Sequence, residues 1–443
     1  MGHDDILKAI EAGGHGRVKY AIADIDGVLR AKVISREKFR SAMSNDVAFC
    51  DVLFGWDVAD TCYDNSRFAG WHTGYPDHKA SIDPATFRTV PWDDGLPYFL
   101  ADFSRDANVP CPRAQLRKIA AKCEELGFRP EFAHEFEWYN FAGTPRSIDA
   151  ADYINLTPIT PGMFGYSQLR PAQFRDYCNE LFDLLNRFGI PVETFHTETG
   201  PGVYEASIAH APIVEAADRA VLFKAAVKEI ASRHGIVASF MAKWDGNLPG
   251  SGGHIHQSLL SLDGKRNLFN MAEPELLESY LAGLLTCLPD ILPMYAPTIN
   301  SYKRLRNGAW APTSVTWGMD NRTAAVRLIN GDDGTRLEMR VPGADCNPYI
   351  AMAACLASGI YGIKHKLKLS EPASIGNAYA QKGAVKLPDN LQDATRAMKK
   401  STIPEGIFDR FFLDHFIASR EWECKEYNKA VTNWELKRYL EII

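Results

Sequence analysis

The chain has 443 residues, of which 46% are hydrophobic and 23% are charged, and its net charge is −6. This length supports a sizeable core and more than one domain, and the acidic balance gives no electrostatic reason to expect binding to nucleic acid or an anionic membrane. The nine cysteines are scattered and odd in number, which excludes a disulfide framework or a zinc ribbon.

The N-terminus, MGHDDILKAIEAGGHG, is polar and lacks the layout of a signal peptide. The sequence contains no run of about 18 apolar residues, so we expect no transmembrane helix. Both features, together with the cysteine pattern, predict a protein of the reduced cytoplasm.

The first half of the chain begins with a predicted hairpin. Two β-prone runs, residues 18–25 and 28–34, flank an Asp-Gly turn. Residues 48–97 are rich in Asp, Gly, Pro, Trp and Tyr without clear periodicity, so we expect binding loops there. Two prolines within residues 106–113 mark the predicted boundary between two domains.

Helical patterns follow this boundary. We predict helices over residues 113–126, over residues 216–230 with Gly235 as a stop, and over residues 349–363. The Asn347-Pro348 pair suits the start of the last helix, with asparagine as N-cap and proline in the first turn. Helices mixed with short strands, without βαβ regularity, favour an α+β fold.

Charged residues recur at a spacing of two, which puts both side chains on one face of a strand. The pairs are Glu135 and Glu137, His254 and His256, Arg336 and Glu338, and Glu338 and Arg340, with Glu198 and Glu205 more loosely spaced. One such pair alone is most often a solvated face. These pairs, however, lie in apolar surroundings, where uncompensated charges are costly, and this favours a functional site.

The chemistry of these side chains indicates a metal and phosphates. Glutamates with a histidine suit a hard ion such as Mg²⁺ or Mn²⁺, and the arginines suit phosphate or carboxylate ligands. A glycine-rich stretch, residues 250–253, lies directly before His254 and would let the backbone approach a ligand closely. It is not a Walker A loop, because no G-K-[ST] follows it.

In their order, these motifs resemble the glutamine synthetase superfamily, and most of all its γ-glutamylpolyamine and γ-glutamylamine synthetase branch. Lys243-Trp244, followed by residues 249–254 and Ser258, is similar to the family's ATP-site signature. The other matching segments are His196–Glu205, Asn300–Leu305, Trp317–Arg322, Arg336–Arg340 and Asn347–Tyr349. The similarity runs from the first hairpin to residues 434–440 and covers nearly the whole chain.

The resemblance implies an α+β fold with two domains. The first is a β-grasp N-terminal domain, residues 15–105, and the second is a glutamine-synthetase-type catalytic domain, residues 106–443, with an antiparallel barrel-like sheet and helices. It also implies a homo-oligomer, a ring of six subunits that is stacked or single. Active sites would form between neighbours, so that Trp56 and Asp57 act in the adjacent subunit.

Roles are carried over from the family by position. One metal would be held by Glu137, Glu198 and Glu205, and a second by Glu135, His254 and Glu338, giving two or more Mg²⁺ or Mn²⁺ ions per subunit. ATP, the co-substrate, would contact His256, Ser258, Arg327 and Arg336. Glutamate would be held by Arg304, Arg340 and the backbone of Gly250. Arg322 would act on the transferring phosphoryl group.

The sequence departs from ammonia-using members at the amine site. The family's flap reads tyrosine-glutamate-alanine-proline, whereas residues 309–312 read Ala-Trp-Ala-Pro. The Asp-Gly-Ser-Ser motif of the N-terminal domain is replaced by residues 54–60, which keep Asp57 as a base but not the serines. An indole at Trp310, with Trp56 opposite, favours a bulky amine over ammonium. The alternative is that Trp310 packs in a core.

We therefore predict an ATP-dependent ligase that joins the γ-carboxylate of glutamate to an organic amine through γ-glutamyl phosphate. Asp57, Asp60 and Asp64 would suit a polyamine, whereas Trp56, Tyr63 and Trp310 would suit a bulky or aromatic monoamine, which we favour. The alternatives are an ordinary ammonia-using glutamine synthetase, a non-catalytic structural member, and a guanidino-kinase-like phosphotransferase. The intact metal ligands and the pair Arg304 and Arg340 disfavour the last two.

Overall fold

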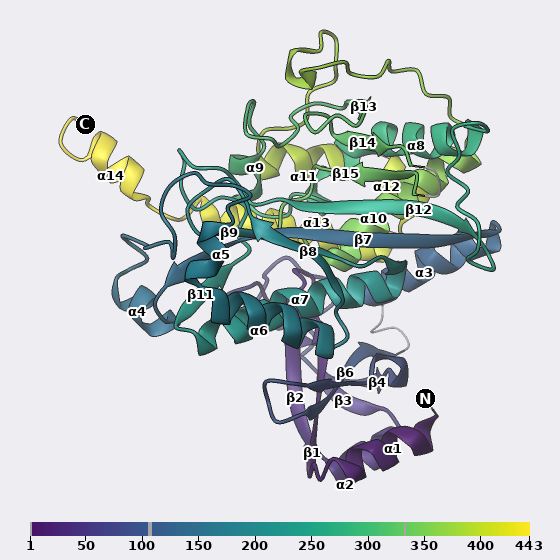
Figure 1. Cartoon of the computed structure of the whole chain (residues 1–443), viewed down its shortest axis with the longest axis vertical. Coiled ribbons are helices and arrows are strands. Elements are labelled where there is room, and N and C mark those ends of the chain that lie inside the picture. The colour runs from purple at the N-terminus through teal and green to yellow at the C-terminus, as the bar shows by residue number, and fades with distance from the viewer. Residues whose placement is uncertain (1, 105–108, 332–333) are drawn as a thin grey trace.

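The hairpin at the start of the chain is fixed by an aspartate in its turn. Strands β1 (Arg17–Ala23) and β2 (Leu29–Ser35) pair antiparallel, which confirms the predicted hairpin. The carboxylate of Asp24 accepts hydrogen bonds from the backbone N–H groups of Asp26 and Val28. In this computed structural model, which describes residues 2–104, 109–331 and 334–443, the hairpin forms one edge of a small sheet (Figure 1).

The small sheet has the strand order β2-β1-β6-β4-β3, with β5 paired to β6. Its other strands are β3 (Val47–Cys50), β4 (Asp77–Ile82), β5 (Arg88–Val90) and β6 (Leu96–Phe103). The expectation of loops throughout residues 48–97 is therefore wrong in part. Strands β3, β4 and β5 have only three to six residues each and are too short to show a periodic pattern, and residues 55–76 are the irregular part.

The large sheet crosses the middle of the molecule in Figure 1, with the strand order β13-β14-β15-β12-β7-β9-β8. Strands β10 and β11 also pair with β7. The bounds are β7 (Phe128–Ala142), β8 (Val192–Thr197), β9 (Val203–Ile208), β10 (Ala211–Pro212), β11 (Ile236–Ser239), β12 (Gly253–Ser261), β13 (Trp317–Met319), β14 (Val326–Ile329) and β15 (Arg336–Met339). The mixture of sheets and helices confirms the predicted α+β class.

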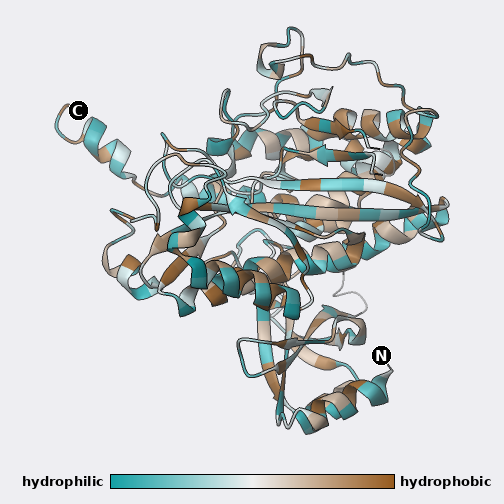
Figure 2. Cartoon of the chain, in the orientation of Figure 1, coloured by the Kyte–Doolittle hydropathy of each residue, from teal (hydrophilic) through white to brown (hydrophobic). Residues whose placement is uncertain are grey.

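The two faces of the large sheet differ in chemistry, and Figure 2 shows hydrophilic and hydrophobic residues alternating along β7 and β12. Phe136, Ile255 and Leu337 are completely buried on one face, where Phe136 stacks on Phe223 of α7. The charged residues that alternate with them point to the other face. The predicted same-face pairs are thus confirmed on three adjacent strands.

Three helices follow the sequence prediction closely, namely α3 (Pro112–Glu125), α7 (Ile213–Arg233) and α10 (Pro348–Lys364). The Asn347 side chain accepts a hydrogen bond from the backbone N–H of Tyr349, as expected of an N-cap. Gly235, with φ +65°, follows the end of α7. Helices α3 and α7 pack on β7, and α10 packs on both of them.

The remaining helices surround this core. They are α1 (His3–Ala12), α2 (Arg36–Ala42), α4 (Pro145–Ala150), α5 (Leu169–Gln173), α6 (Arg175–Arg187), α8 (Glu275–Ile291), α9 (Ser301–Arg304), α11 (Leu391–Lys400), α12 (Ile403–Ile407), α13 (Arg410–Tyr427) and α14 (Asn433–Tyr439). Short 3₁₀ turns are η1 (Asp51–Phe54), η2 (Pro84–Thr86), η4 (Leu292–Met294) and η5 (Ala378–Ala380). Helix α14 projects away from the body of the molecule (Figure 1).

Helix α8 is the one helix in the described chain that is long and apolar enough to cross a membrane by composition. This helix and the turn after it form an apolar stretch, Glu275–Met294, which is 67% buried inside the fold. This burial is typical of a core helix, and α8 packs on α10.

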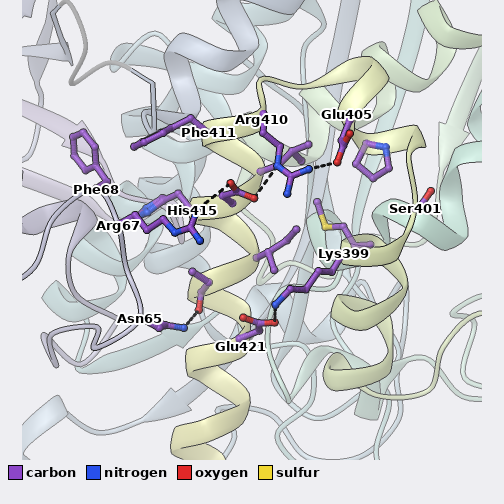
Figure 3. A pocket seen from close by; sticks show the side chains of 16 residues that line it. Asn65, Arg67, Phe68, Lys399, Ser401, Glu405, Arg410, Phe411, His415 and Glu421 are labelled. Carbon is purple, nitrogen blue, oxygen red and sulfur yellow. Dashed lines mark hydrogen bonds and ion pairs between the residues drawn. The ribbon is translucent and has the colours of Figure 1, made fainter.

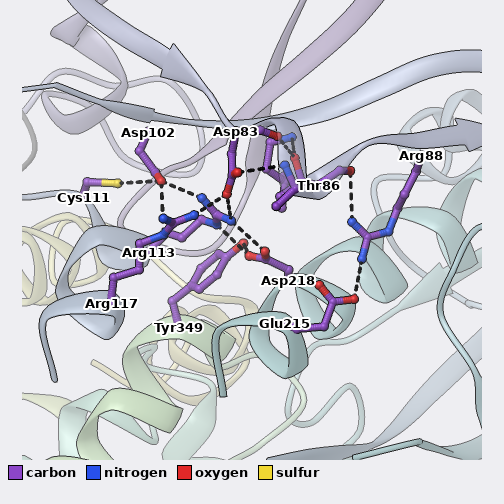
Figure 4. Close-up of polar contacts among 12 residues, drawn as sticks. Asp83, Thr86, Arg88, Asp102, Cys111, Arg113, Arg117, Glu215, Asp218 and Tyr349 are labelled. Carbon is purple, nitrogen blue, oxygen red and sulfur yellow. Dashed lines mark hydrogen bonds and ion pairs between the residues drawn. The ribbon is translucent and has the colours of Figure 1, made fainter. Parts of the chain in front are cut away.

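A buried arginine joins the region of the small sheet to helices that pack on the large sheet (Figure 4). Arg113 of α3 donates to Asp83, which follows β4, at 2.7 Å, to Asp102 of β6 at 2.6 Å, and to Asp218 of α7 at 2.7 Å. The hydroxyl of Tyr349 donates to the same Asp218. Because the arginine is only 3% exposed, these carboxylates are needed to compensate its charge.

The predicted domain boundary, between residues 105 and 106, lies outside the described residues. The small sheet spans residues 17–103 and the large sheet begins at residue 128. The division into two domains remains a prediction.

Candidate active site

A cavity of about 530 Å³ lies over the charged face of the large sheet. It brings together most of the predicted site residues, which come from five strands, from helix α9 and from loops. These are Glu135, Glu137, Glu198, Glu205, Gly250, His254, His256, Arg304, Trp310, Arg322, Arg327, Arg336, Glu338 and Arg340.

One end of the cavity floor is a group of carboxylates on β7 and β9. Glu137 and Glu205 are directly opposite each other in the antiparallel register, so both point into the cavity. Glu198 follows β8, and its ligand atoms lie within 4.8 Å of those of Glu205 and His196. A carboxylate oxygen of Glu137 accepts the backbone N–H of Gly252 at 2.9 Å, which fixes its orientation.

The other end of the floor centres on His254. Its Nδ1 lies 3.2 Å from Glu135 Oε1 and 3.4 Å from Glu338 Oε1. The strand register explains this, because His254 is opposite Glu135 across β12 and β7, and His256 is opposite Glu338 across β12 and β15. The ligand atoms of Glu135, His256 and Glu338 also lie within 4.8 Å of one another.

Each of the two groups of possible metal ligands includes a histidine that the sequence did not predict as a ligand. His256, predicted for the nucleotide, is as close to the carboxylates as a metal ligand would be. His196 joins Glu198 and Glu205 and was not predicted as a site residue. The signal was available, because His196 and Glu198 have the same spacing of two as the other pairs.

The electrostatics of the floor favour a bound cation. Burial and the neighbouring carboxylates Glu135 and Glu137 raise the pKa of Glu205 to about 8. Burial alone would raise the pKa of Glu338 as well, but Arg340 and His254 lower it to about 2. Like charges held together in this way are relieved by a divalent ion, and oxygen and imidazole ligands suit Mg²⁺ or Mn²⁺. The residues present therefore fit the predicted metals.

Arginines form one side of the cavity. Arg340 pairs with Glu338, and its Nε donates to the carbonyl of Arg322 at 3.0 Å. Arg327 Nη1 lies 3.1 Å from the other oxygen of Glu338. The guanidinium of Arg304 is buried and donates to the carbonyl of Val341 at 2.9 Å. These contacts hold the guanidinium groups in fixed positions, as recognition of a carboxylate or phosphate requires.

Gly250 is required for this packing. A Cβ atom on this residue would lie 2.6 Å from Cγ of Arg304. Only glycine therefore lets the backbone lie against the arginine.

A second cavity, of about 420 Å³, adjoins the first and shares Glu135, His256 and Arg336 with it. Ser258 lines this cavity and donates to the carbonyl of Thr335, while Arg336 Nε lies 3.2 Å from His256 Nδ1. Three of the four predicted nucleotide residues thus meet here. The fourth, Arg327, lines only the first cavity among the described residues.

Two aromatic residues stand at the edge of the first cavity. Trp310 is 62% exposed, so the alternative that it packs in a core is wrong. Tyr166 is 73% exposed and stacks on His196 with ring centroids 4.5 Å apart. Both residues have left-handed backbone conformations, with φ of +58° and +52°. Tyr166 was not predicted, and no motif in the sequence marks it.

Trp56 and Asp57 do not join these residues. Among the described residues that line the first cavity, none precedes Glu135. The carboxylate of Asp57 accepts hydrogen bonds from the backbone of its own loop and, at 2.9 Å, from Nε1 of Trp422 on α13. The guanidinium of Arg30 lies 5.0 Å above the Trp56 ring.

The loop that carries Trp56 and Asp57 is held on α13, beside a separate cavity of about 310 Å³ (Figure 3). Asn65 donates to the carbonyl of Ala418 at 2.8 Å. The charged residues of this cavity pair with one another, as Lys399 does with Glu421 and Arg410 with Asp414. The cavity shares no described lining residue with the catalytic one.

Comparison with protein families decides the assignment. The model described as "Glutamine synthetase, catalytic domain" matches residues 109–439. The chain belongs to the glutamine synthetase family. Members of this family are ATP-dependent glutamate ligases that use divalent metal ions. The cavity over the large sheet brings together carboxylates, histidines and arginines, which are the kinds of residue that such chemistry needs.

Two relatives and one solved structure are similar to this chain over nearly its whole length. A protein of Dictyostelium discoideum named type-1 glutamine synthetase 2 is 48% identical, covering 99% of this chain and 86% of its own. A glutamate–isopropylamine ligase of Pseudomonas sp. is 38% identical, covering 98% of this chain and 97% of its own. A structure described as GmaS in complex with ADP superposes with a TM-score of 0.85 at 26% identity, covering 99% of both chains.

The names of these two relatives differ, because one is named a glutamine synthetase and the other a glutamate–isopropylamine ligase. Family membership therefore establishes the ligase class and the glutamate and ATP substrates of the family, and it leaves the amine open.

Proposed function

We propose that this chain is a glutamate–amine ligase that forms a γ-glutamylamide from an organic amine. The observation that carries the proposal is the exposed indole of Trp310 at the edge of the catalytic cavity. The flap that Trp310 resembles carries a glutamate in ammonia-using members. Ammonium is small and strongly hydrated and needs converging carboxylates, whereas an indole offers a large apolar surface.

The proposed reaction has two steps. The γ-carboxylate of glutamate attacks the γ-phosphorus of ATP, which gives γ-glutamyl phosphate and ADP. The amine nitrogen then attacks the acyl carbon, inorganic phosphate leaves, and the nitrogen loses a proton to a base. In this scheme Arg304 and Arg340 hold the glutamate, and Arg322 contacts the phosphoryl group as it transfers.

Divalent metal ions, when bound, neutralise charge on the phosphate oxygens during this transfer. The residues that would hold them are Glu135, Glu137, Glu198, Glu205, His254 and Glu338, with His196 and His256 adjacent. The nucleotide phosphates would lie near His256, Ser258, Arg327 and Arg336.

The relatives support two versions of this function. The name of the Pseudomonas relative favours an alkylamine, and the name of the Dictyostelium relative favours ammonia. An ordinary glutamine synthetase is therefore the second candidate. The exposed Trp310 favours the organic amine, because ammonia gains nothing from an apolar wall.

A phosphate-release assay decides between them. The full-length protein, with glutamate, ATP and Mg²⁺, is tested with ammonia, alkylamines, arylalkylamines and polyamines at equal free-base concentration. We expect kcat/KM for at least one organic amine to exceed that for ammonia by roughly tenfold or more. A value for ammonia that equals or exceeds every organic amine contradicts the proposal and leaves ordinary glutamine synthetase in its place.

The assembly is part of the same proposal. The resemblance to the family implies a ring of six subunits with sites between neighbours. Trp56 and Asp57 lie outside the cavity of their own chain, and we infer that they complete the site of a neighbouring subunit. Asp57 would then act as the base for the amine, and Trp56 would form a second wall of the amine site. A cytoplasmic location also remains a prediction.

A further inference from the structure

A shallow depression of about 550 Å³ lies on the outer side of Trp310. Three segments of the chain line it, namely Trp310 itself, residues 319–323 and residues 373–376. Trp310 and Arg322 line both this depression and the catalytic cavity, so the two spaces meet at these side chains. Nothing in the reaction scheme above uses the depression.

The walls of the depression expose apolar side chains. Trp310 is 62% exposed, Met319 is 47% exposed and Ile375 is 97% exposed. They come from three separate segments and gather around one space. Apolar surface brought together in this way is typical of a ligand-binding site, because each part gains when a ligand covers it.

The depression is held in shape by hydrogen bonds between its segments. The Asn321 side chain donates to the carbonyls of Ser374 at 3.0 Å and Gly376 at 2.8 Å. The backbone N–H of Ser374 donates to the carbonyl of Trp317 at 2.7 Å. Residues 373–376 are thereby fixed against the end of β13, and Ile375 is presented from a braced loop.

The charges around the depression exclude one class of ligand. The carboxylate of Asp320 is paired with Arg327, whose Nε lies at 2.8 Å, and is therefore already compensated. Arg322 is exposed and carries a positive charge into the same space. No other described lining residue is charged. A distal ammonium group would meet Arg322 beside a carboxylate that is already paired. An uncharged tail is not repelled by Arg322 and can cover the exposed apolar side chains.

We propose, resting on the amine-ligase function above, that this depression is the subsite for the tail of the amine. Its ligand is a primary monoamine with an uncharged alkyl or arylalkyl tail. The nitrogen enters the catalytic cavity past Arg322 and Trp310, and the tail covers Trp310, Met319 and Ile375. Met319 and Ile375 are then specificity-determining residues, and polyamines are excluded.

The first test compares amines of equal length. With the full-length enzyme, ATP, glutamate and Mg²⁺, pentylamine should give a kcat/KM at least about tenfold above that of 1,5-diaminopentane, because only the latter places a cation beside Arg322. Along the series from methylamine to hexylamine, kcat/KM should rise by up to about fourfold for each methylene group that becomes buried.

The second test uses three variants. Ile375→Ser should lower the ratio of kcat/KM for hexylamine over methylamine by roughly tenfold. Ile375→Glu should raise the ratio for 1,5-diaminopentane over pentylamine, because it supplies the missing carboxylate. Val385→Ser is the matched control, because Val385 is 58% exposed and lies outside the depression. It should leave both ratios unchanged.

The outcomes separate the subsite from the function on which it rests. If no organic amine is a better substrate than ammonia, the amine-ligase function fails and the subsite fails with it. If organic amines are substrates but chain length has no effect, or the diamine matches the monoamine, the subsite is overturned while the ligase function stands. The same holds if both Ile375 variants behave like Val385→Ser.

Discussion

The floor and the edge of the catalytic cavity are built from different kinds of structure. The floor lies on paired strands, where Glu135 and Glu137 on β7 and His254 on β12 are fixed by the register of the sheet. The edge consists of loops, and its two aromatic residues, Tyr166 and Trp310, are exposed and left-handed.

The strands of the floor and the loops of the edge suit different tasks. Charges that must stay together before any substrate arrives are held by strands, whose hydrogen bonds and apolar opposite face leave them little freedom. Left-handed backbone in a bulky residue costs on the order of 1 kcal/mol and persists only where neighbouring contacts hold it. We infer that the floor determines the reaction and that the edge determines which amine takes part.

The largest effect is expected from a change in the floor. In Glu137→Gln, the amide oxygen can still accept the N–H of Gly252, so the fold is kept while one negative charge is lost. We expect turnover to fall by roughly 10³-fold or more, because the loss removes a proposed metal ligand. Phosphate release under saturating substrates measures this effect.

The control for this change is Glu180→Gln. Glu180 on α6 pairs with His234, away from the cavity, so its loss should leave turnover within about twofold. Melting temperatures of both variants should stay near that of the unchanged protein. Turnover of Glu137→Gln close to the unchanged level would remove Glu137 from the proposed metal site.

A second prediction concerns the part of the edge that we assign to a neighbouring subunit. Asp57→Ala should lower turnover by about 10²-fold, the usual contribution of a general base. Mixing Asp57→Ala chains with Arg322→Ala chains before assembly should restore part of the activity, because some sites then receive both intact residues. A fully active monomer, measured by light scattering at assay concentration, rules out this arrangement.

A third prediction is that one substitution at the edge shifts the amine specificity toward ammonia. Trp310→Glu restores the carboxylate found in the flap of ammonia-using members, and it removes the apolar wall. We expect the ratio of kcat/KM for ammonia over the best organic amine to rise by some tens-fold, from loss of about 2 kcal/mol of apolar contact. Trp310→Ala is the control, since it should weaken the organic amine without improving ammonia.

The sequence predicted the floor better than the edge, and the reason is the same structural difference. A spacing of two on a strand has one geometric meaning, so it placed the members of each pair on one face. The resemblance to the family then brought Glu135, Glu137, His254 and Glu338 together. The same rule would have found His196, had it been applied to His196 and Glu198. The strands at residues 47–50 and 77–82 were missed because pairing with distant segments stabilises them, and this pairing leaves no local pattern.

The edge could be predicted only through resemblance to a family. Trp310 was found because the family's flap has a glutamate at this position. Tyr166 belongs to no motif and is brought to His196 by the loop between α4 and α5. The depression beside Ile375 depends on hydrogen bonds between residues more than fifty positions apart, which the sequence does not encode in any short pattern.

The smallest expected effect is on the stability of the metal-free protein as a function of pH. Burial, with Glu135 and Glu137 nearby, raises the pKa of Glu205 to about 8 from a usual value of 4.5. Burial lowers the pKa of His196, but the Glu205 carboxylate raises it more, to about 9 overall. Both groups thus bind a proton more tightly in the folded state than in the unfolded state.

A raised folded pKa gives stability that is complete at low pH and is lost as the pH rises through the folded pKa. In a chelator, the melting temperature should therefore fall by a few degrees between about pH 6 and pH 9. Glu338, whose pKa is lowered to about 2 chiefly by Arg340 against the effect of burial, contributes constant stability over this window. Mg²⁺ should flatten the profile, because it holds the carboxylates in their charged form. Glu205→Gln should flatten the profile without Mg²⁺. A metal-free protein that is more stable at pH 9 than at pH 6 would contradict the raised pKa values of Glu205 and His196.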